Sequence, residues 1–216
     1  MVTNLSERNS VFSEWMRELR DIDIQNDRMR FRRNMERVGE IAAYEISKLL
    51  PYKMTSVQTP MGEAICSELE NQPVLATILR AGIPLHQGLL DYFDKADNAF
   101  IAAYRKHHRD GSFEIEQQYF TCPDITNRAL ILADPMLATG ASLVLALKTL
   151  LNTGKPSQIH IVCAIACTEG LELMERKFPE AHIWAGAIDD ELTARGFIVP
   201  GLGDAGDLAF GTKKQS

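Results

Sequence analysis

The chain has 216 residues and a formal net charge of −6 at pH 7, with 45% hydrophobic and 24% charged residues. This composition is typical of globular proteins and excludes disordered, collagenous and coiled-coil chains, and the length fits one domain over residues 1–216. Proteins that bind nucleic acid usually carry a basic excess, so the acidic balance argues against such a partner. The sequence has neither an apolar run near the ~20 residues of a membrane helix nor an apolar secretion signal, so we expect a cytoplasmic protein without a membrane partner.

The four cysteines, Cys66, Cys122, Cys163 and Cys167, lie far apart and lack the spacing of zinc ligands. Most of them have apolar neighbours in the sequence. We therefore interpret them as reduced structural thiols of a cytosolic protein.

The first quarter of the chain has a helical pattern. Apolar residues recur every three or four positions between Phe31 and Leu49, with arginines and glutamates between them, and Pro51 is expected to end this helix. The arginines could meet an anionic ligand. Arginines interleaved with glutamates are more typical of a solvated helix face with ion pairs, and we favour that interpretation.

After residue 72 short apolar runs alternate with helical stretches. The predicted strands are residues 73–79, 99–104, 129–133, 158–166 and 181–188, and the predicted helices are 83–93, 142–151 and one that ends near Phe178-Pro179. Runs that are apolar throughout are typical of strands buried on both faces. Their alternation with helices predicts an α/β fold with a parallel sheet.

Residues 105–120 do not follow this alternation of strands and helices. Asp110-Gly111 is a turn signal, and side-chain character alternates from Phe113 to Gln118, so we expect an antiparallel β-arm that serves as a flap or a dimer contact. Adjacent residues of a strand point to opposite faces, so we do not expect the pair His107-His108 to bind a metal.

In an open α/β sheet, ligands bind beyond the carboxyl ends of the strands, where three loops of this chain are distinctive. The first, Asp134–Ser142, joins a predicted strand to a helix and ends in small and hydroxyl residues. Free N–H groups and the helix dipole at such a helix start suit a phosphate, whereas the Gly-Lys-Ser/Thr of a nucleoside triphosphate loop is missing. The alternative is an ordinary helix start capped by Thr139 or Ser142.

The second loop contains Arg80, which follows a buried strand and precedes Ala81-Gly82. Such an arginine can clamp a phosphate oxygen, although a lone arginine there is more often an ion-pair partner. The third loop, residues 196–212, has too many glycines for a helix or strand interior, and its regularly placed apolar residues favour a backbone wrapped around a flat base. Before it lies the acidic cluster Asp189-Asp190-Glu191, for which we favour a helix-start cap over a ligand site.

Together the three loops resemble those of the uracil phosphoribosyltransferase family, and the resemblance runs from about Arg28 to Lys213. The most specific match is the run Asp134-Pro135-Met136-Leu137-Ala138-Thr139-Gly140-Ala141-Ser142. The stretch Pro200–Asp207 and the ending Phe210-Gly211-Thr212 also match. The sequence departs from the family at Ala141, where a glycine is common, and at Lys106–Phe113, where an acidic stretch followed by leucine, glutamate and proline is usual.

The resemblance implies a type I phosphoribosyltransferase fold, in which helices flank a central parallel sheet. A C-terminal hood, formed by about residues 189–216 with the N-terminal helical segment, would cover the site. The implied reaction transfers the phosphoribosyl group of 5-phospho-α-D-ribose 1-diphosphate to uracil, giving UMP and diphosphate in pyrimidine salvage. Mg²⁺ would be bound mainly through the diphosphate of the substrate, with no metal site of the protein's own. A homodimer or higher oligomer is implied, and GTP is a candidate effector.

Site residues follow from the resemblance position by position. The loop of Asp134, Pro135, Met136, Leu137, Ala138, Thr139, Gly140, Ala141 and Ser142 would hold the ribose and its 5-phosphate. Arg80 and Arg105 would contact the diphosphate, and Arg105 would neutralise charge on it as it leaves.

The base would be held by Ile198 and by the backbone of Gly203, Asp204 and Ala205. Asp204 would also touch the phosphoribosyl donor and position water or magnesium near the attacking nitrogen. Asp134 would orient the ribose hydroxyls. Two other functions stay open on the same fold, namely phosphoribosyl transfer to a different nucleobase and a nucleotide-sensing RNA-binding regulator.

Overall fold

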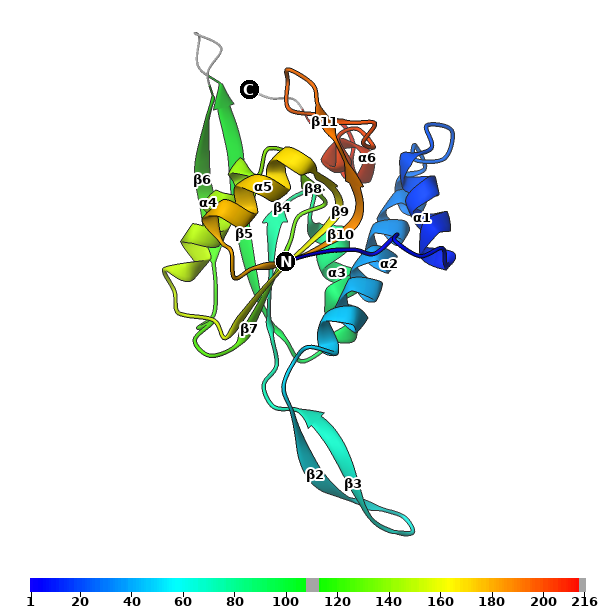
Figure 1. Ribbon diagram of the computed structural model, residues 1–216, viewed down its shortest axis with the longest axis vertical. Helices are drawn as coiled ribbons and strands as arrows, with labels where there is room; N and C mark the ends of the chain where they lie inside the picture. Colours follow the sequence, from blue (N-terminus) through cyan, green and yellow to red (C-terminus); the bar gives the residue numbers. More distant parts are fainter. Residues whose placement is uncertain (108–112, 214–216) are drawn as a thin grey trace.

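The computed structural model describes residues 1–107 and 113–213, and the side chains of these residues except 103–107 and 113–118. In this part of the chain, an eight-stranded sheet has the order β1-β10-β9-β7-β4-β5-β6, with the short β8 beside β9 (Figure 1). From edge to edge these strands are β1 (Val2–Asn4), β10 (His182–Asp189), β9 (Gln158–Cys167), β7 (Ala129–Ala133), β4 (Val74–Leu79), β5 (Asp97–His107) and β6 (Phe113–Thr121), and β8 is Met136–Leu137. Neighbouring strands are parallel except for β5 and β6. The predicted α/β fold is confirmed.

Helices cover both faces of the sheet (Figure 1). One face carries α4 (Ala141–Leu151) and α5 (Thr168–Lys177), and the other carries α1 (Val11–Arg20), α2 (Arg28–Ser47) and α3 (Ile83–Tyr92). Within β4, Leu75 belongs to the core on the α2 side while Val74 and Ala76 belong to the core on the α4 side. This two-sided burial explains why β4 is an unbroken apolar run in the sequence.

A second hairpin, absent from the sequence-based prediction, projects from the end of the molecule opposite to α6 (Ala205–Phe210) (Figure 1). It consists of β2 (Tyr52–Thr59) and β3 (Gly62–Leu69), which pair antiparallel around the turn Pro60-Met61. Most side chains on both of its faces are exposed, Met61 to 96%. Because neither face is buried, the usual alternation of apolar and polar residues is missing, and no pattern in residues 52–69 predicts strands.

The predicted β-arm is present as the antiparallel pair β5 and β6, in which Arg105 stands opposite Ile115. The pairing register shifts between Ala102 and Ala103. The expected turn at Asp110-Gly111 lies outside the described residues, as do the side chains of His107 and His108.

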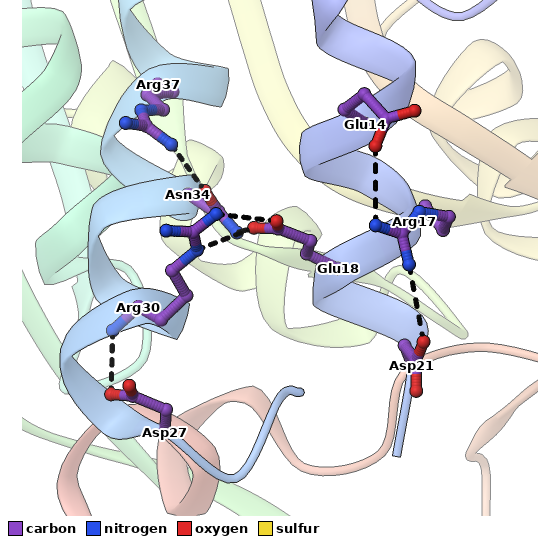
Figure 2. A network of polar contacts seen from close by, with 8 residues as sticks. All are labelled: Glu14, Arg17, Glu18, Asp21, Asp27, Arg30, Asn34 and Arg37. Carbon is purple, nitrogen blue, oxygen red and sulfur yellow. Dashed lines mark hydrogen bonds and ion pairs between the residues drawn. The ribbon is translucent and has the colours of Figure 1, made fainter. Parts of the chain in front are cut away.

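A network of charged side chains joins α1 to α2 on the far face of the sheet from α4 (Figure 2). Glu18 accepts two hydrogen bonds from Arg30, at 2.6 and 2.8 Å, and a third from the buried Asn34 at 2.7 Å. These donors lower the pKa of Glu18 to about 2. Arg33 of α2 pairs with Glu36 and Glu40, so the interpretation as partners of glutamates is confirmed for Arg30 and Arg33. Arg32 and Arg37 differ, because Arg32 donates to the Ala209 carbonyl and Arg37 to the Asn34 side chain.

Candidate active site

The three loops singled out in the sequence meet at the carboxyl ends of the parallel strands. Arg80 follows β4 and forms an ion pair of 2.7 Å with Asp207 of α6. Gly206 lies against Arg80, since a Cβ added there would lie 3.8 Å from the Arg80 Nε and 3.2 Å from an oxygen of Asp204. At the base of the second loop, a Cβ on Gly82 would lie 3.0 Å from the carbonyl oxygen of Ala133, where the first loop begins. The loops therefore share one edge of the sheet.

The first loop leaves β7 at Asp134, pairs briefly with β9 as β8, and enters α4. Gly140 is the N-cap of α4 and has a positive φ of 81°, a conformation that favours glycine. It has no side chain with which to cap the helix, and the long contact of 3.4 Å from the Ala141 N–H to the Thr139 hydroxyl is a weak substitute. Among the described residues, Thr139 therefore caps this helix start only weakly, so the alternative of a start capped by Thr139 holds in part.

A small cavity of about 30 Å³ lies in this loop. Its lining residues are Asp134, Met136, Ala138, Thr139, Gly140, Ala141, Ser142 and Leu143. Backbone N–H groups at the first turn of α4 and the positive end of its dipole lie at this position, and both suit an anion.

The backbone of the loop rests on α5. A Cβ on Gly170 would lie 2.3 Å from the carbonyl oxygen of Ala138 and 3.0 Å from that of Leu137. Glycine at this position of α5 therefore allows the helix to support the loop at close range. No local sequence pattern marks Gly170, because a glycine inside a helix does not reveal which backbone it contacts.

The third loop contains the short strand β12 (Ile198–Val199) and α6, and its strand pairs with β11 (Glu191–Leu192), which lies just before the loop. After β12 the chain runs through Gly201 and Gly203, both with positive φ, to Asp204. Asp204 is the N-cap of α6 and accepts a hydrogen bond of 2.9 Å from the Asp207 N–H. This bond and the Arg80–Asp207 ion pair connect Asp204 to Arg80 through one intermediate residue.

Two of the residues expected at the base, Ile198 and Ala205, are buried in the protein core. Gly203 and Asp204, in contrast, line a cavity of about 350 Å³ between the third loop and the start of α2. The remaining lining residues are Gln25, Asn26, Arg28, Leu202, Asp207, Leu208 and Thr212. Apolar residues and carboxylates of the loop therefore line this cavity together with Gly203, which has no side chain to cover its backbone.

Comparison with known proteins decides the family. The family model described as "Uracil phosphoribosyltransferase" matches residues 6–212. The chain belongs to the uracil phosphoribosyltransferase family.

Relatives of this family resemble the chain over nearly its whole length. A uracil phosphoribosyltransferase of Porphyromonas gingivalis is 50% identical over 213 residues, which cover 98% of this chain and 99% of that protein. A uracil phosphoribosyltransferase of Pyrococcus furiosus is 39% identical over 201 residues, which cover 92% of this chain and 85% of that protein. A solved structure of a protein from Aquifex aeolicus superposes with a TM-score of 0.87 at 29% identity and covers 98% of both chains. The chain is therefore a glycosyltransferase of pyrimidine salvage on the type I phosphoribosyltransferase fold.

Arg105, expected at the diphosphate in this family, lies in β5 near the end of the strand. β5 is the parallel neighbour of β4 in the sheet, and Arg80 follows the end of β4. Its side chain lies outside the described part of the structure, so its contact with diphosphate stays a prediction.

The acidic cluster differs from its prediction. No helix follows Asp189-Asp190-Glu191 directly, since Asp189 ends β10 and Glu191 starts β11. Asp189 is buried and pairs with Arg20 of α1 at 2.8 Å. The predicted helix-start cap was wrong, because the partner of Asp189 is a distant residue that local sequence does not reveal.

Of the four cysteines, Cys163 and Cys167 are buried as expected of packing residues, whereas Cys122 is half-buried and Cys66 is exposed on the β2–β3 hairpin. All four cysteines are free, and burial raises the pKa of the Cys163 thiol, which disfavours the reactive thiolate. Among the side chains that the structure describes, which exclude those of residues 103–118 and 214–216, no group of three His, Cys, Asp or Glu is placed to hold a metal ion. None of the helices in this described part is both long and apolar enough to cross a membrane.

Proposed function

We propose that the shared edge of the sheet binds 5-phospho-α-D-ribose 1-diphosphate and uracil side by side and transfers the phosphoribosyl group between them. The observation that carries this proposal is the contact of Arg80 with Asp207, next to Asp204, because it joins the loop expected to hold diphosphate to the loop expected to hold the base. Reactants held on two such loops are brought within reach of each other.

The first loop, Asp134–Ser142, would hold the ribose and its 5-phosphate. The cavity at the poorly capped start of α4 supports this role, because the first-turn N–H groups can donate to phosphate oxygens. Asp134 stands where the loop begins and would orient the ribose hydroxyls. Its carboxylate would also favour the positive charge that develops on the sugar as the diphosphate leaves.

The diphosphate would be held by the guanidinium groups of Arg80 and Arg105. A guanidinium offers paired donors to phosphate oxygens and stays charged at all working pH values. The nearby carboxylates form no ligand cluster for a resident ion among the described residues, whereas Mg²⁺ keeps several waters and binds substrate phosphates through few protein ligands. Mg²⁺ that arrives with the diphosphate would fit this site, and it would supply positive charge to the leaving group beside Arg80 and Arg105.

Uracil would be read by main-chain groups of Gly203, Asp204 and Ala205, next to Ile198. Burial of Ile198 and Ala205 supports the rigid backbone that such recognition needs. Asp204 is held by its bond to the Asp207 N–H and would position water or magnesium near the attacking nitrogen.

We further propose that the protein is a cytoplasmic homo-oligomer. Free thiols at all four cysteines fit a reducing compartment. The β2–β3 hairpin exposes Met54, Met61 and Ile65 and has no core of its own, and an isolated two-stranded hairpin is marginally stable in water. A second copy of the chain would cover it. GTP as an effector rests on the family resemblance and is tested by its addition to the assay described next.

The deciding experiment measures formation of UMP and diphosphate from uracil, phosphoribosyl diphosphate and Mg²⁺, with Arg105→Ala as a parallel variant. Cytosine, hypoxanthine and adenine replace uracil in matched reactions. We expect turnover with uracil at least a hundredfold above that with the other bases, and a large loss in Arg105→Ala. Equal turnover with a purine, or no product with uracil, would refute the proposed substrate.

A further inference from the structure

An ion pair outside the three loops joins the end of α1 to the end of β10. The Arg20 guanidinium donates two parallel hydrogen bonds to the Asp189 carboxylate, at 2.8 and 2.9 Å. The Asp189 side chain is only 7% exposed and that of Arg20 25%. Bidentate pairs of this kind have a specific geometry. Loss of the arginine would leave a buried carboxylate without its partner, which destabilises the folded protein.

The pair also holds the backbone of Gly201 in the third loop. The Gly201 N–H donates to Asp189 at 2.9 Å, and the Gly201 carbonyl accepts from Arg20 at 3.2 Å. Both polar backbone groups of this residue are thus satisfied by the same two side chains. Gly201 has a φ of 58°, and a Cβ there would lie 2.2 Å from the carbonyl oxygen of Ile198, so the chain is tightly constrained at this point.

The next residue, Leu202, is also held by the region around the end of α1. Gln25 is buried in the turn after α1, and its amide group faces the carbonyl oxygens of Leu202 and Leu19. The amide orientation that satisfies both of its polar atoms places the nitrogen towards these oxygens, where it donates to Leu202 at 2.7 Å and to Leu19 at 3.2 Å. At Gly203 the packing around the loop becomes loose. A Cβ added there would have Leu208 as its sole neighbour within 4 Å in the described part of the chain, apart from the adjoining residues. The loop is therefore fixed at 201–202 immediately before it opens to the large cavity at Gly203-Asp204.

Helix α1, which carries Arg20, is itself held firmly in place. Two residues before Arg20, Glu18 binds Arg30 and Asn34 of α2, which secures α1 to α2 (Figure 2). Leu19, between these two residues, is fully buried. A displacement of Arg20 would have to move an anchored helix, so the Gly201 backbone is held against a firm element.

We propose that Arg20 and Asp189 are positioning residues for the base, which set the backbone at Gly201-Leu202 so that Gly203-Asp204 is already arranged to receive uracil. This inference rests on the proposed function of the third loop. A preformed loop loses little conformational freedom on binding, so loosening it weakens base binding more than donor binding. Neither residue is expected to touch the reacting atoms.

The test compares steady-state constants of Arg20→Gln, Arg20→Lys and wild-type enzyme for both substrates. We expect Arg20→Gln to raise the KM for uracil at least tenfold, with the KM for phosphoribosyl diphosphate changed less than threefold. Arg20→Lys keeps the charge and should recover part of the loss. Arg17→Gln is the matched control, because Arg17 is on the same helix and pairs only with the exposed Glu14 and with Asp21 among the described residues.

A second variant keeps the test decisive if Arg20→Gln does not fold. Gln25→Leu keeps the side-chain shape but removes the bond to Leu202, and we expect at least a threefold rise in the KM for uracil alone. An unchanged KM for uracil in the folded variants, or equal rises for both substrates, would overturn the inference. Failure of the wild-type enzyme to make UMP would instead refute the proposed function, so the two failures are distinguishable.

Discussion

The Arg80 guanidinium and the Asp207 carboxylate meet at 2.7 Å, although 127 positions separate them in the chain. About a third of each side chain is exposed, and ion pairs with this much exposure contribute roughly 0–1 kcal/mol. The pair is therefore weak enough for Arg80 to exchange its carboxylate partner for a phosphate oxygen. It nevertheless keeps the guanidinium at the edge of the site and close to Asp204.

Substitution of Arg80 is the first prediction. Hydrogen bonds to charged groups contribute about 1.5–3 kcal/mol, so Arg80→Ala should lower kcat/KM for phosphoribosyl diphosphate by roughly 10- to 150-fold. Arg80→Lys should fall between this variant and wild type, because it keeps the charge and loses the paired donors. Initial rates at varied donor concentration measure the effect.

Asp207→Asn is the matched comparison for Arg80. It removes the competing carboxylate and leaves the guanidinium in place, so we expect the KM for phosphoribosyl diphosphate to change by less than fivefold. A loss as large as that of Arg80→Ala would show that Asp207, rather than the diphosphate, is the functional partner of Arg80.

Gly170 of α5 gives a second prediction. Its missing side chain lets Ala138 and Leu137 of the first loop lie against the helix, and Gly170→Ala would force the two segments apart. Because a shift of ~1 Å at a catalytic loop can cost about 100-fold in rate, we expect at least a tenfold loss of kcat/KM for phosphoribosyl diphosphate. Glu172→Ala, on the exposed side of α5, is the control and should retain wild-type kinetics. Wild-type kinetics in Gly170→Ala would contradict the supporting role.

Much of the parallel sheet could be predicted, because its strands leave a strong sequence signal. The predicted strand at 129–133 coincides with β7, and the run at 158–166 differs from β9 by one residue. Both are buried on two faces and are therefore apolar throughout. β1 and β8, with three and two residues, are too short for any pattern to identify.

The parts that were missed depend on contacts between distant residues. The β2–β3 hairpin lacks a buried face and so lacks alternation. Asp189 was read as part of a local acidic cluster, whereas its partner Arg20 lies 169 positions away. The loops of the site were found because glycines, hydroxyls and a strand-end arginine mark them locally, but the pairing of Arg80 with Asp207 depends on how the sheet and α6 come together.

The hairpin supplies a third prediction. The Glu70 N–H donates to the Pro51 carbonyl at 3.0 Å at its base, so residues 53–68 can be replaced by a short glycine-containing turn without disturbing the core. We expect the full chain to be a dimer or larger by light scattering and the shortened chain to be smaller. Substitution of the exposed Met54 and Ile65 by lysine should act in the same direction. Equal masses for all forms would exclude the hairpin as the contact.

The pH dependence of stability gives the last prediction, through the buried His160 on β9. Its Nδ1 accepts from the Trp184 indole at 3.2 Å, and its Nε2 faces the Gln158 side-chain oxygen at 3.0 Å, so the pair of contacts fits the neutral ring. Burial, with a smaller contribution from the charge of His182, lowers the pKa of His160 from 6.5 to about 4. Between these values the unfolded chain binds a proton that the folded chain does not.

Stability from His160 is therefore complete above about pH 6.5 and is lost as the pH falls towards 4, by up to about 3 kcal/mol. Burial also lowers the pKa values of His86 and His182, so the wild-type slope should exceed that of one proton. Urea unfolding across this range should give a slope that is shallower by about one proton in His160→Gln. An unchanged slope in that variant would show that His160 is already protonated in the folded protein, or that other groups dominate this range.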